Sequence, residues 1–484
     1  MRNRATAAQL LGACALVWAG LAPARADTLR EALASAYNTN PTLQGARADQ
    51  RAVDENVVIE RADGLPSASG GGTFTEYLYN STDSPLNPKR QYNATLSLGV
   101  PIYSGGAVKN AVRAAKTRVK AGQADLRATE SAIFSQVVAT YMDVIQNEAI
   151  VRLNANQVDV LGVNLQATSD RFEIGDLTRT DVAQSSARLE LAKGDLRGAS
   201  ADLVSARERY IQLIGHAPGE LAPPPPLPGL PESAEQAVAI ALESNPDLVA
   251  AHERLQASAY DIEVAGSTRL PQIEVFAGGD YTRQERAEDI ALGDAFPKSS
   301  TGATAGVRAT IPIFQGGRPA ALERQAQARA ASALEQEIAT ERDIIAQVRA
   351  AFSSWQAANA IIDSTQSAIE AAELSLEGVR AESTVGNRTI LDILNAEQEL
   401  LNSRVQLVIA RRNAYVAGFT LLAAMGKAEA RDLNLDVGGP LYDPQDNYER
   451  VKGNIFDWSF DPDPEAQSTR TVDTPAQDGS ISSQ

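Results

Sequence analysis

The sequence predicts an α+β membrane protein with a twofold internal repeat, in which each half supplies two β-strands and long α-helices. Three observations predict this fold class. The two halves share motifs in the same order, long stretches repeat apolar residues every seven positions, and short segments alternate apolar with polar residues. These patterns indicate, respectively, a duplicated unit, coiled-coil helices and strands with one apolar face.

The duplication is visible in paired motifs. Asn40-Pro41 recurs as Asn245-Pro246 at an offset of 205 residues, whereas the motif PIYSGG at 101–106 recurs as PIFQGG at 312–317, an offset of 211. The second half therefore carries extra residues between these motifs, which we place in a surface loop. The predicted organisation is a signal at 1–26, a first repeat at 27–222, a proline-rich linker at 223–231, a second repeat at 232–433 and a tail at 434–484.

The helices are predicted to form a rod. Apolar residues recur every seven positions from Val137 to Phe172 and from Val182 to Tyr210, and the second half repeats both series. The predicted long helices, 107–172 and 318–383, would each extend about 100 Å at 1.5 Å per residue. Their return helices, 177–214 and 389–425, are shorter. A further short helix, 41–64, would stack on the return helix and complete a rod of constant thickness.

Four strands are predicted near 67–80, 93–103, 271–284 and 301–314. Runs of about ten residues with alternating apolar and polar side chains are typical of transmembrane barrels, although a half-exposed soluble sheet is the alternative for this pattern. Four strands cannot close a barrel, and lipid does not tolerate open sheet edges, so subunits must share one. Three subunits would supply twelve strands, which is enough to leave a lumen.

The N-terminus indicates secretion. Arg2 and Arg4 precede an apolar run and the small-residue sequence APARA at 22–26, the arrangement of a cleavable signal. Cys14, the only cysteine, would be removed with it, and a lipoprotein box at this cysteine is the alternative. The net charge of −17 disfavours nucleic acid as a partner.

No catalytic, cofactor or metal site is predicted. The two histidines, His216 and His252, have no spacing that suggests metal binding or a nucleophile–base pair. The tail at 434–484 is rich in Asp, Pro, Ser and Gln, a composition that favours disorder or loose wrapping around the rod.

The chain resembles the TolC family of outer-membrane efflux and type I secretion proteins. The resemblance lies in the order, duplication and spacing of these motifs and in the segments FEIGDL at 172–177 and VGNRTILDIL at 385–394. The resemblance implies a homotrimer in outer-membrane lipid, with a twelve-stranded barrel and a periplasmic helical tunnel closed at its tip. It also implies two partners, a periplasmic adaptor and an inner-membrane transporter of the ABC or RND type. The cargo would be proteins, small toxic molecules or both.

The predicted helix tips carry the candidate site residues. Gly175 and Gly386 lie where the chain must reverse, and a helix cap alone would explain a glycine there. The resemblance implies that the two tips are also where the adaptor docks. The residues assigned to this docking are Gly175, Leu177, Thr178, Gly386 and Thr389.

A second group is predicted at the tunnel aperture. Asp392 follows Arg388 at a spacing that allows a helical ion pair, and a solvated surface pair is the simpler interpretation. The resemblance implies instead a ring of Asp392 carboxylates in the constriction, with Arg388 and Asp181 holding neighbouring hairpins closed. Asn395 and Ser383 stand where family members often have an aspartate and a tyrosine, which predicts a thinner closing network.

Two other classes of protein remain as alternatives. A periplasmic adaptor would also have long helical hairpins, but it would carry one hairpin where this sequence predicts two. A coiled-coil scaffold without a channel would not need strands placed symmetrically at the same ends of the helices.

Overall fold

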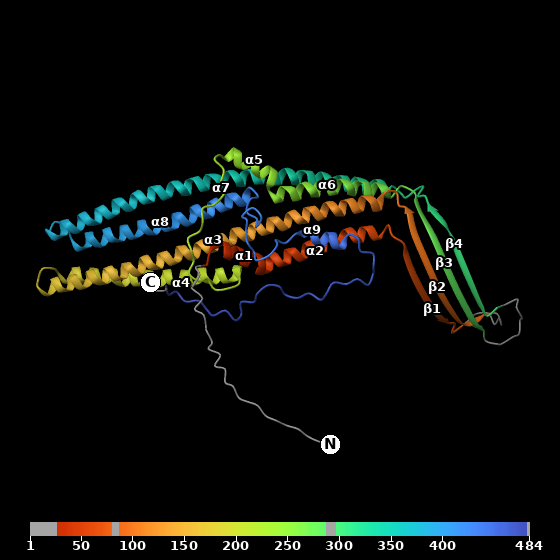
Figure 1. Cartoon of the computed structure of the whole chain (residues 1–484), viewed down its shortest axis with the longest axis horizontal. Helices are drawn as coiled ribbons and strands as arrows, with labels where there is room; N and C mark the ends of the chain where they lie inside the picture. The colour runs from red at the N-terminus through yellow and green to blue at the C-terminus, as the bar shows by residue number, and fades with distance from the viewer. Residues whose placement is uncertain (1–26, 80–86, 287–296, 482–484) are drawn as a thin grey trace, which may run out of the picture.

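The computed structural model describes residues 27–79, 87–286 and 297–481, so the predicted secretion signal lies outside the described residues. The chain forms an elongated rod of helices with a single sheet extending from one end (Figure 1). Both helical hairpins have their tips at the opposite end of the rod. The membrane-type strands and the predicted aperture residues are therefore separated by the full length of the long helices.

Each repeat contributes two short helices, two strands, one long helix and one return helix. The first repeat comprises α1 (Leu29–Thr39), α2 (Pro41–Ala62), β1 (Ser67–Glu76), β2 (Pro88–Tyr103), α3 (Ala107–Glu173) and α4 (Arg179–Ile214). The second comprises α5 (Ala234–Ser244), α6 (Pro246–Ser267), β3 (Gln272–Arg286), β4 (Ser299–Thr310), α7 (Arg318–Thr384) and α8 (Ile390–Ala424), and α9 (Pro444–Val451) follows in the tail.

The repeated Asn-Pro motif joins the stacked short helices. The Asn40 side-chain oxygen accepts hydrogen bonds from the first amides of α2, and Pro41 occupies a position where no amide hydrogen is needed. The Asn40 amide also donates to the carbonyl of Leu213 at 3.0 Å, in the last turn of α4. Asn245 repeats this contact with Ala424 of α8 at 2.9 Å. One side chain thus starts a helix and fixes the end of another.

The four strands form one antiparallel sheet in the order β1-β2-β3-β4. Leu96, Leu98 and Val307 are exposed in the single chain, and Phe74 stacks on Tyr92 across β1 and β2 with ring centroids 5.1 Å apart. β1 and β4 are left as open edges. An open edge with unpaired backbone groups requires another strand if the sheet is to lie in lipid.

Strand boundaries differ from the predicted ones by several residues. β2 begins at Pro88 rather than 93, and β1 ends at Glu76 rather than 80. β4 ends at Thr310 rather than 314, because Pro312 lacks the amide hydrogen that a strand ladder needs. The following turn depends on glycine, since Gly316 and Gly317 both have positive φ.

The main core lies at mid-height, where α1 and the end of α4 pack against α3. Phe134, Val137 and Tyr141 are fully buried there. The Tyr141 hydroxyl donates to the carbonyls of Asp27 and Ala222, at 2.8 and 2.6 Å, so it ties the start of the first repeat to its end. Heptad packing and this central cluster together hold the rod.

Of the two states expected for the tail, disorder or wrapping around the rod, the structure has the second. Residues 434–481 follow a defined path that includes α9, and the chain then runs back along the rod beside α2 and α4 (Figure 1). Asn447 donates to the Asp54 carboxylate of α2 at 2.7 Å, and Ile481 packs on the main core. Composition left both states open because the tail is polar, and its polar groups find partners on the first repeat.

Within the described residues, no helix combines the length and apolar character that a membrane crossing requires.

Candidate functional site at the hairpin tips

The two hairpin tips are built in the same way. Gly175 and Gly386 adopt φ of +81° and +84°, which allows the chain to turn out of each long helix. Two residues and the N-cap threonine follow before the next helix begins. Each return helix then starts with a reciprocal capping box, Thr178 with Asp181 and Thr389 with Asp392.

The predicted aperture carboxylates Asp181 and Asp392 are therefore also helix caps. In the second tip, the amide and the hydroxyl of Thr389 donate to Asp392 Oδ2 at 2.9 and 2.8 Å, and Asp181 makes the same pair of bonds with Thr178. These hydrogen bonds hold the pKa of both carboxyls below the ordinary 3.8. Both groups are fully ionised at neutral pH, and each lies at the exposed end of the rod.

The expected ion pair between Arg388 and Asp392 is replaced by another. Arg388 Nε donates to Glu382 Oε2 at 2.7 Å, which joins the end of α7 to the turn. Arg388 precedes the first residue of α8, so the helical spacing that would bring it over Asp392 does not apply. In the first tip, Arg171 and Asp176 make the corresponding link at 2.7 Å with the charges in reversed order.

Asn395, which the sequence placed at the aperture, connects the two hairpins. Its side-chain oxygen accepts a hydrogen bond from Arg188 Nη2 of α4 at 2.8 Å. Asn395 is exposed and Arg188 is half-buried. The amide that stands in place of a family carboxylate thus contacts an arginine within the same chain.

Glu397 is a functional candidate that sequence reasoning missed. Its side chain is only 3% exposed, and its two oxygens accept from Asn164 of α3 at 3.0 Å while Oε1 also accepts from Arg380 of α7 at 2.9 Å. Beside it, Leu161, Leu189 and Leu394 form a small apolar cluster across the hairpins. This buried carboxylate links α8 to two other helices, and its loss would take a charged acceptor from both Asn164 and Arg380. A glutamate in a heptad pattern gives no sequence signal of this burial.

The residues predicted to dock an adaptor lie on the exposed surface of the tips. Gly175, Thr178, Gly386 and Thr389 are exposed and Leu177 is half-buried. Sequence reasoning overlooked their apolar neighbours Ile174 and Val385, which are 80% and 71% exposed. Each tip therefore presents one large apolar side chain beside a glycine.

Within the described residues of the single chain, no cluster of three or more His, Cys, Asp or Glu side chains is arranged to hold a metal ion.

Fold and site together define a membrane transport protein with a long helical extension. The family model described as "Outer membrane efflux protein" matches residues 32–216 and 237–427. The chain belongs to this family. Outer membrane efflux protein BepC of Brucella suis biovar 1 (strain 1330) is 33% identical over 437 residues, covering 90% of this chain and 92% of BepC. Outer membrane protein TolC of Escherichia coli (strain K12) is 25% identical over 426 residues, covering 84% of each.

A solved structure has the same fold. The Campylobacter jejuni CmeC outer membrane channel superposes with a TM-score of 0.72 at 18% identity, covering 89% of this chain and 90% of that one. These findings confirm the family resemblance and the predicted fold class. The protein is an outer-membrane channel with a periplasmic helical tunnel, which gives exported substrates a path out of the cell.

Proposed function

We propose that three copies of this chain close one channel, and that the channel accepts cargo from an inner-membrane transporter of the ABC or RND type through a periplasmic adaptor. The open edges of β1 and β4 support the assembly, because three four-stranded sheets joined edge to edge make a barrel wide enough for a lumen. Relatives of this chain include an outer membrane efflux protein and an alkaline protease secretion protein, which supports small toxic molecules, proteins or both as cargo.

The observation that carries the proposed mechanism is the pair of links between the hairpins of one chain. Arg188 with Asn395, and Glu397 with Asn164, join the first hairpin to the second near the tips. Opening the tunnel requires the hairpins to separate, so these hydrogen bonds must break. The gate is therefore held within each subunit as well as between subunits.

Asp392 is the proposed selective element of the closed gate. Its carboxylate is ionised at neutral pH, and Thr389 occupies one of its oxygens, which leaves Oδ1 free for a cation. Three copies around the axis would form a carboxylate ring that favours cations and concentrates divalent ones. Asp181 and Arg388 would contact the neighbouring hairpin at the same level.

The test is conductance of the purified protein in planar bilayers, for the wild type and Asp392→Ala, with and without divalent cations. We expect a small cation-selective conductance that divalent cations block, and loss of this block in the variant. Asp363→Ala, which removes an exposed carboxylate from the shaft of α7, is the matched control and should keep the block. A block that survives Asp392→Ala would overturn the ring. Failure of the wild type to conduct would overturn the channel assembly itself.

Docking at the tips has its own test. Ile174→Ser with Val385→Ser should reduce co-purification of the adaptor from cells without changing bilayer conductance, because the apolar tip side chains are removed and the gate links remain. Val163→Ser, an exposed apolar residue on the shaft of α3, is the control. Equal adaptor recovery from both variants would exclude the tips as the docking surface.

A further inference from the structure

The tail carries an exposed aromatic segment that the proposed channel does not use. Residues 455–465 have the sequence IFDWSFDPDPE, and Phe456 and Trp458 are 76% and 86% exposed. Trp458 packs edge-on against Phe460 with centroids 6.4 Å apart, but Phe460 is itself exposed. Several large apolar side chains in six residues at a surface indicate a contact that the single chain does not satisfy.

The segment is held in place at both ends. Arg61, in the last turn of α2, donates to the carbonyls of Lys452 and Asn454, the latter at 3.1 Å. Arg450 of α9 then binds both oxygens of Asp461 at 2.8 and 2.9 Å. The aromatic side chains are therefore presented by a fixed loop, at the level where α2 gives way to β1.

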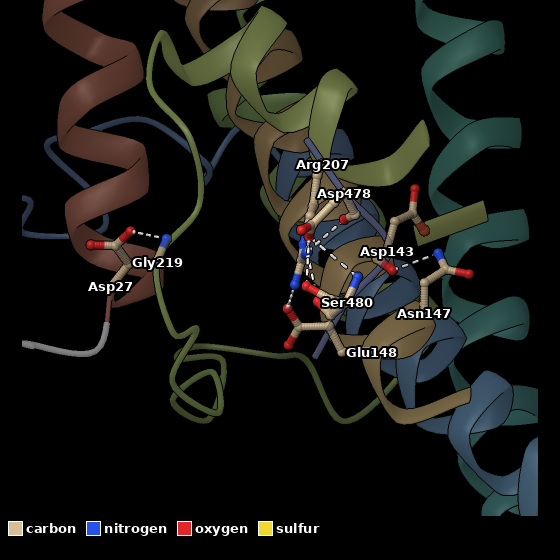
Figure 2. A network of polar contacts seen from close by, with 8 residues as sticks. All are labelled: Asp27, Asp143, Asn147, Glu148, Arg207, Gly219, Asp478 and Ser480. Atoms are coloured by element: carbon tan, nitrogen blue, oxygen red, sulfur yellow. Dashed lines mark hydrogen bonds and ion pairs between the residues drawn. The ribbon is translucent and has the colours of Figure 1, made fainter. Parts of the chain in front are cut away.

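The far end of the tail is fixed as well. Arg207 of α4 donates to the carbonyls of Asp478 and Ser480 at 2.8 and 3.1 Å, and to Glu148 of α3 at 3.0 Å (Figure 2). Helix α9 packs on α2 and also reaches α3 through Gln445 and Tyr448, and beyond α9 the tail runs beside α2 along the outer side of the helical layer (Figure 1). This side is the free flank of the helical layer, since α2 packs on α3, α3 on α6 and α6 on α7.

The opposite flank of the chain has a complementary exposed site at the same level. Ile313 and Phe314, which join β4 to α7, are 96% and 88% exposed. Their counterparts in the first repeat, Ile102 and Tyr103, are 62% and 46% exposed, although they occupy the same motif. The excess exposure is therefore a consequence of lying at the free end of the layer.

Charges near the two sites are also complementary. In the tail, Asp457, Asp463 and Glu465 are exposed, and among the described residues they have no ion pair. At the start of α7, Arg318, Arg324 and Arg329 are exposed and, in the same described part of the chain, equally unpaired. Arg324 lies about 9 Å along α7 from its first residue, and α9 contacts Asp54 about 12 Å before the end of α2. The acidic and basic groups thus lie at similar heights.

We propose that the tail segment 455–465 of one copy docks on the junction of β4 and α7 of the next copy. Phe456, Trp458 and Phe460 cover Ile313 and Phe314, and the tail carboxylates face the arginines of α7. The proposal rests on the trimeric assembly proposed above, in which β4 of one copy meets β1 of the next. A head-to-tail contact of this kind, repeated around a closed ring, uses both flanks of every copy. The three tails then lie on the outside of the trimer, each bound to the next copy.

Paired cysteines test this contact. The only cysteine, Cys14, lies in the predicted signal, so Phe456→Cys with Phe314→Cys would supply the pair of thiols. After mild oxidation of outer membranes, we expect covalent dimers and trimers on a denaturing gel. Phe456→Cys with Val163→Cys, which places the second thiol on the shaft of α3, should give only monomers. A disulfide within one copy would also run as a monomer and would overturn the proposal.

A second measurement keeps the result interpretable if a cysteine pair misfolds. Phe456→Ala with Trp458→Ala should lower the temperature at which the native trimer dissociates, whereas Val472→Ala, an exposed apolar residue elsewhere in the tail, should not. The single variant Phe456→Cys can also be labelled with a water-soluble maleimide, as a trimer in detergent and as a trimer in lipid vesicles. Protection of the introduced thiol only in the vesicles would place the aromatic residues in the membrane and would overturn the proposal. Absence of a wild-type trimer would instead contradict the proposed function.

Discussion

The two long helices α3 and α7 have the same length and the same motif at their start, but very different surroundings. Of the 67 residues in each, 21 are buried in α3 and 7 in α7. α3 packs against α1, α2, α4, α6 and α8, whereas α7 packs against α5, α6 and α8 and leaves most of its length exposed. Duplicated sequence has therefore produced one interior helix and one edge helix.

This difference teaches where the chain is incomplete. Exposed apolar residues such as Leu334, Ile361 and Leu374 lie along α7 itself, and the edge strand β4 precedes α7 in the chain. The first repeat instead buries its heptad residues under α1, α4 and the tail. An edge of this length requires a partner along its whole extent, which supports assembly by sequential edge contacts.

The largest expected effect sharpens the contrast in the core. Phe134→Ala on α3 should destabilise the protein by about 3–5 kcal/mol, since it empties a fully buried aromatic site. Its counterpart on α7, Ile345, is only half-buried, so Ile345→Ala should cost clearly less. Thermal melting in detergent would measure both. Equal losses would mean that assembly buries the edge helix as deeply as the interior one.

The next effect concerns the contact between repeats near the tips. Glu397→Ala should cost about 1.5–3 kcal/mol, because Arg380 and Asn164 lose a charged acceptor. It should also raise conductance in planar bilayers by loosening the closed hairpins. Glu399→Ala removes an exposed carboxylate two residues away and serves as the control. An unchanged conductance in Glu397→Ala would remove this residue from the gate.

A smaller effect concerns the tail, which lies on the first repeat and leaves the second repeat uncovered. Arg207→Ala removes the hydrogen bonds that hold Asp478 and Ser480, so the end of the tail should become sensitive to protease. Melting of the rod should hardly change, because the main core is intact. Arg197→Ala, at an exposed position on the same helix, should leave the tail protected. Release in both variants would show that the tail is held by other contacts.

The smallest effect tests the equivalence of the two tips. The depressed pKa of Asp392 means that its capping contribution is complete above the ordinary 3.8 and is lost as pH falls through the lower folded value. Thr389→Ala removes the hydrogen bond from the hydroxyl but keeps the one from the backbone amide, so the pKa of Asp392 should rise part of the way back and the divalent block should fade at a higher pH than in the wild type. Thr178→Ala should leave the pH profile of the block in place. If the pH dependence of the block shifts in Thr178→Ala and not in Thr389→Ala, the carboxylate ring is formed by Asp181.

Much of the fold was predictable because the signals are periodic. The heptads indicated both hairpins, and their lengths indicated the stacked short helices that Asn40 and Asn245 hold in place. Turn glycines located the tips. Strand ends were less well predicted, since alternation fades gradually where a strand leaves the sheet, and only Pro312 marks a definite end.

The site was predicted less completely. Asp392 and Asp181 were assigned to the aperture from the family resemblance, which stays a prediction, and their capping bonds depend on local geometry. Glu397 and Arg188 were missed because their partners are on other helices and far away in sequence. No spacing along the chain reports which faces of two hairpins meet.

The sequence by itself determined the duplicated helices, the strands and the turns, because each depends on residues close together in the chain. Tertiary structure alone decided which long helix became the interior one, which carboxylate became buried, and that a polar tail would fold back on the first repeat. The physical reason is that burial and pairing depend on packing between distant segments. α3 and α7 share a pattern, but the surrounding helices bury much more of α3 than of α7.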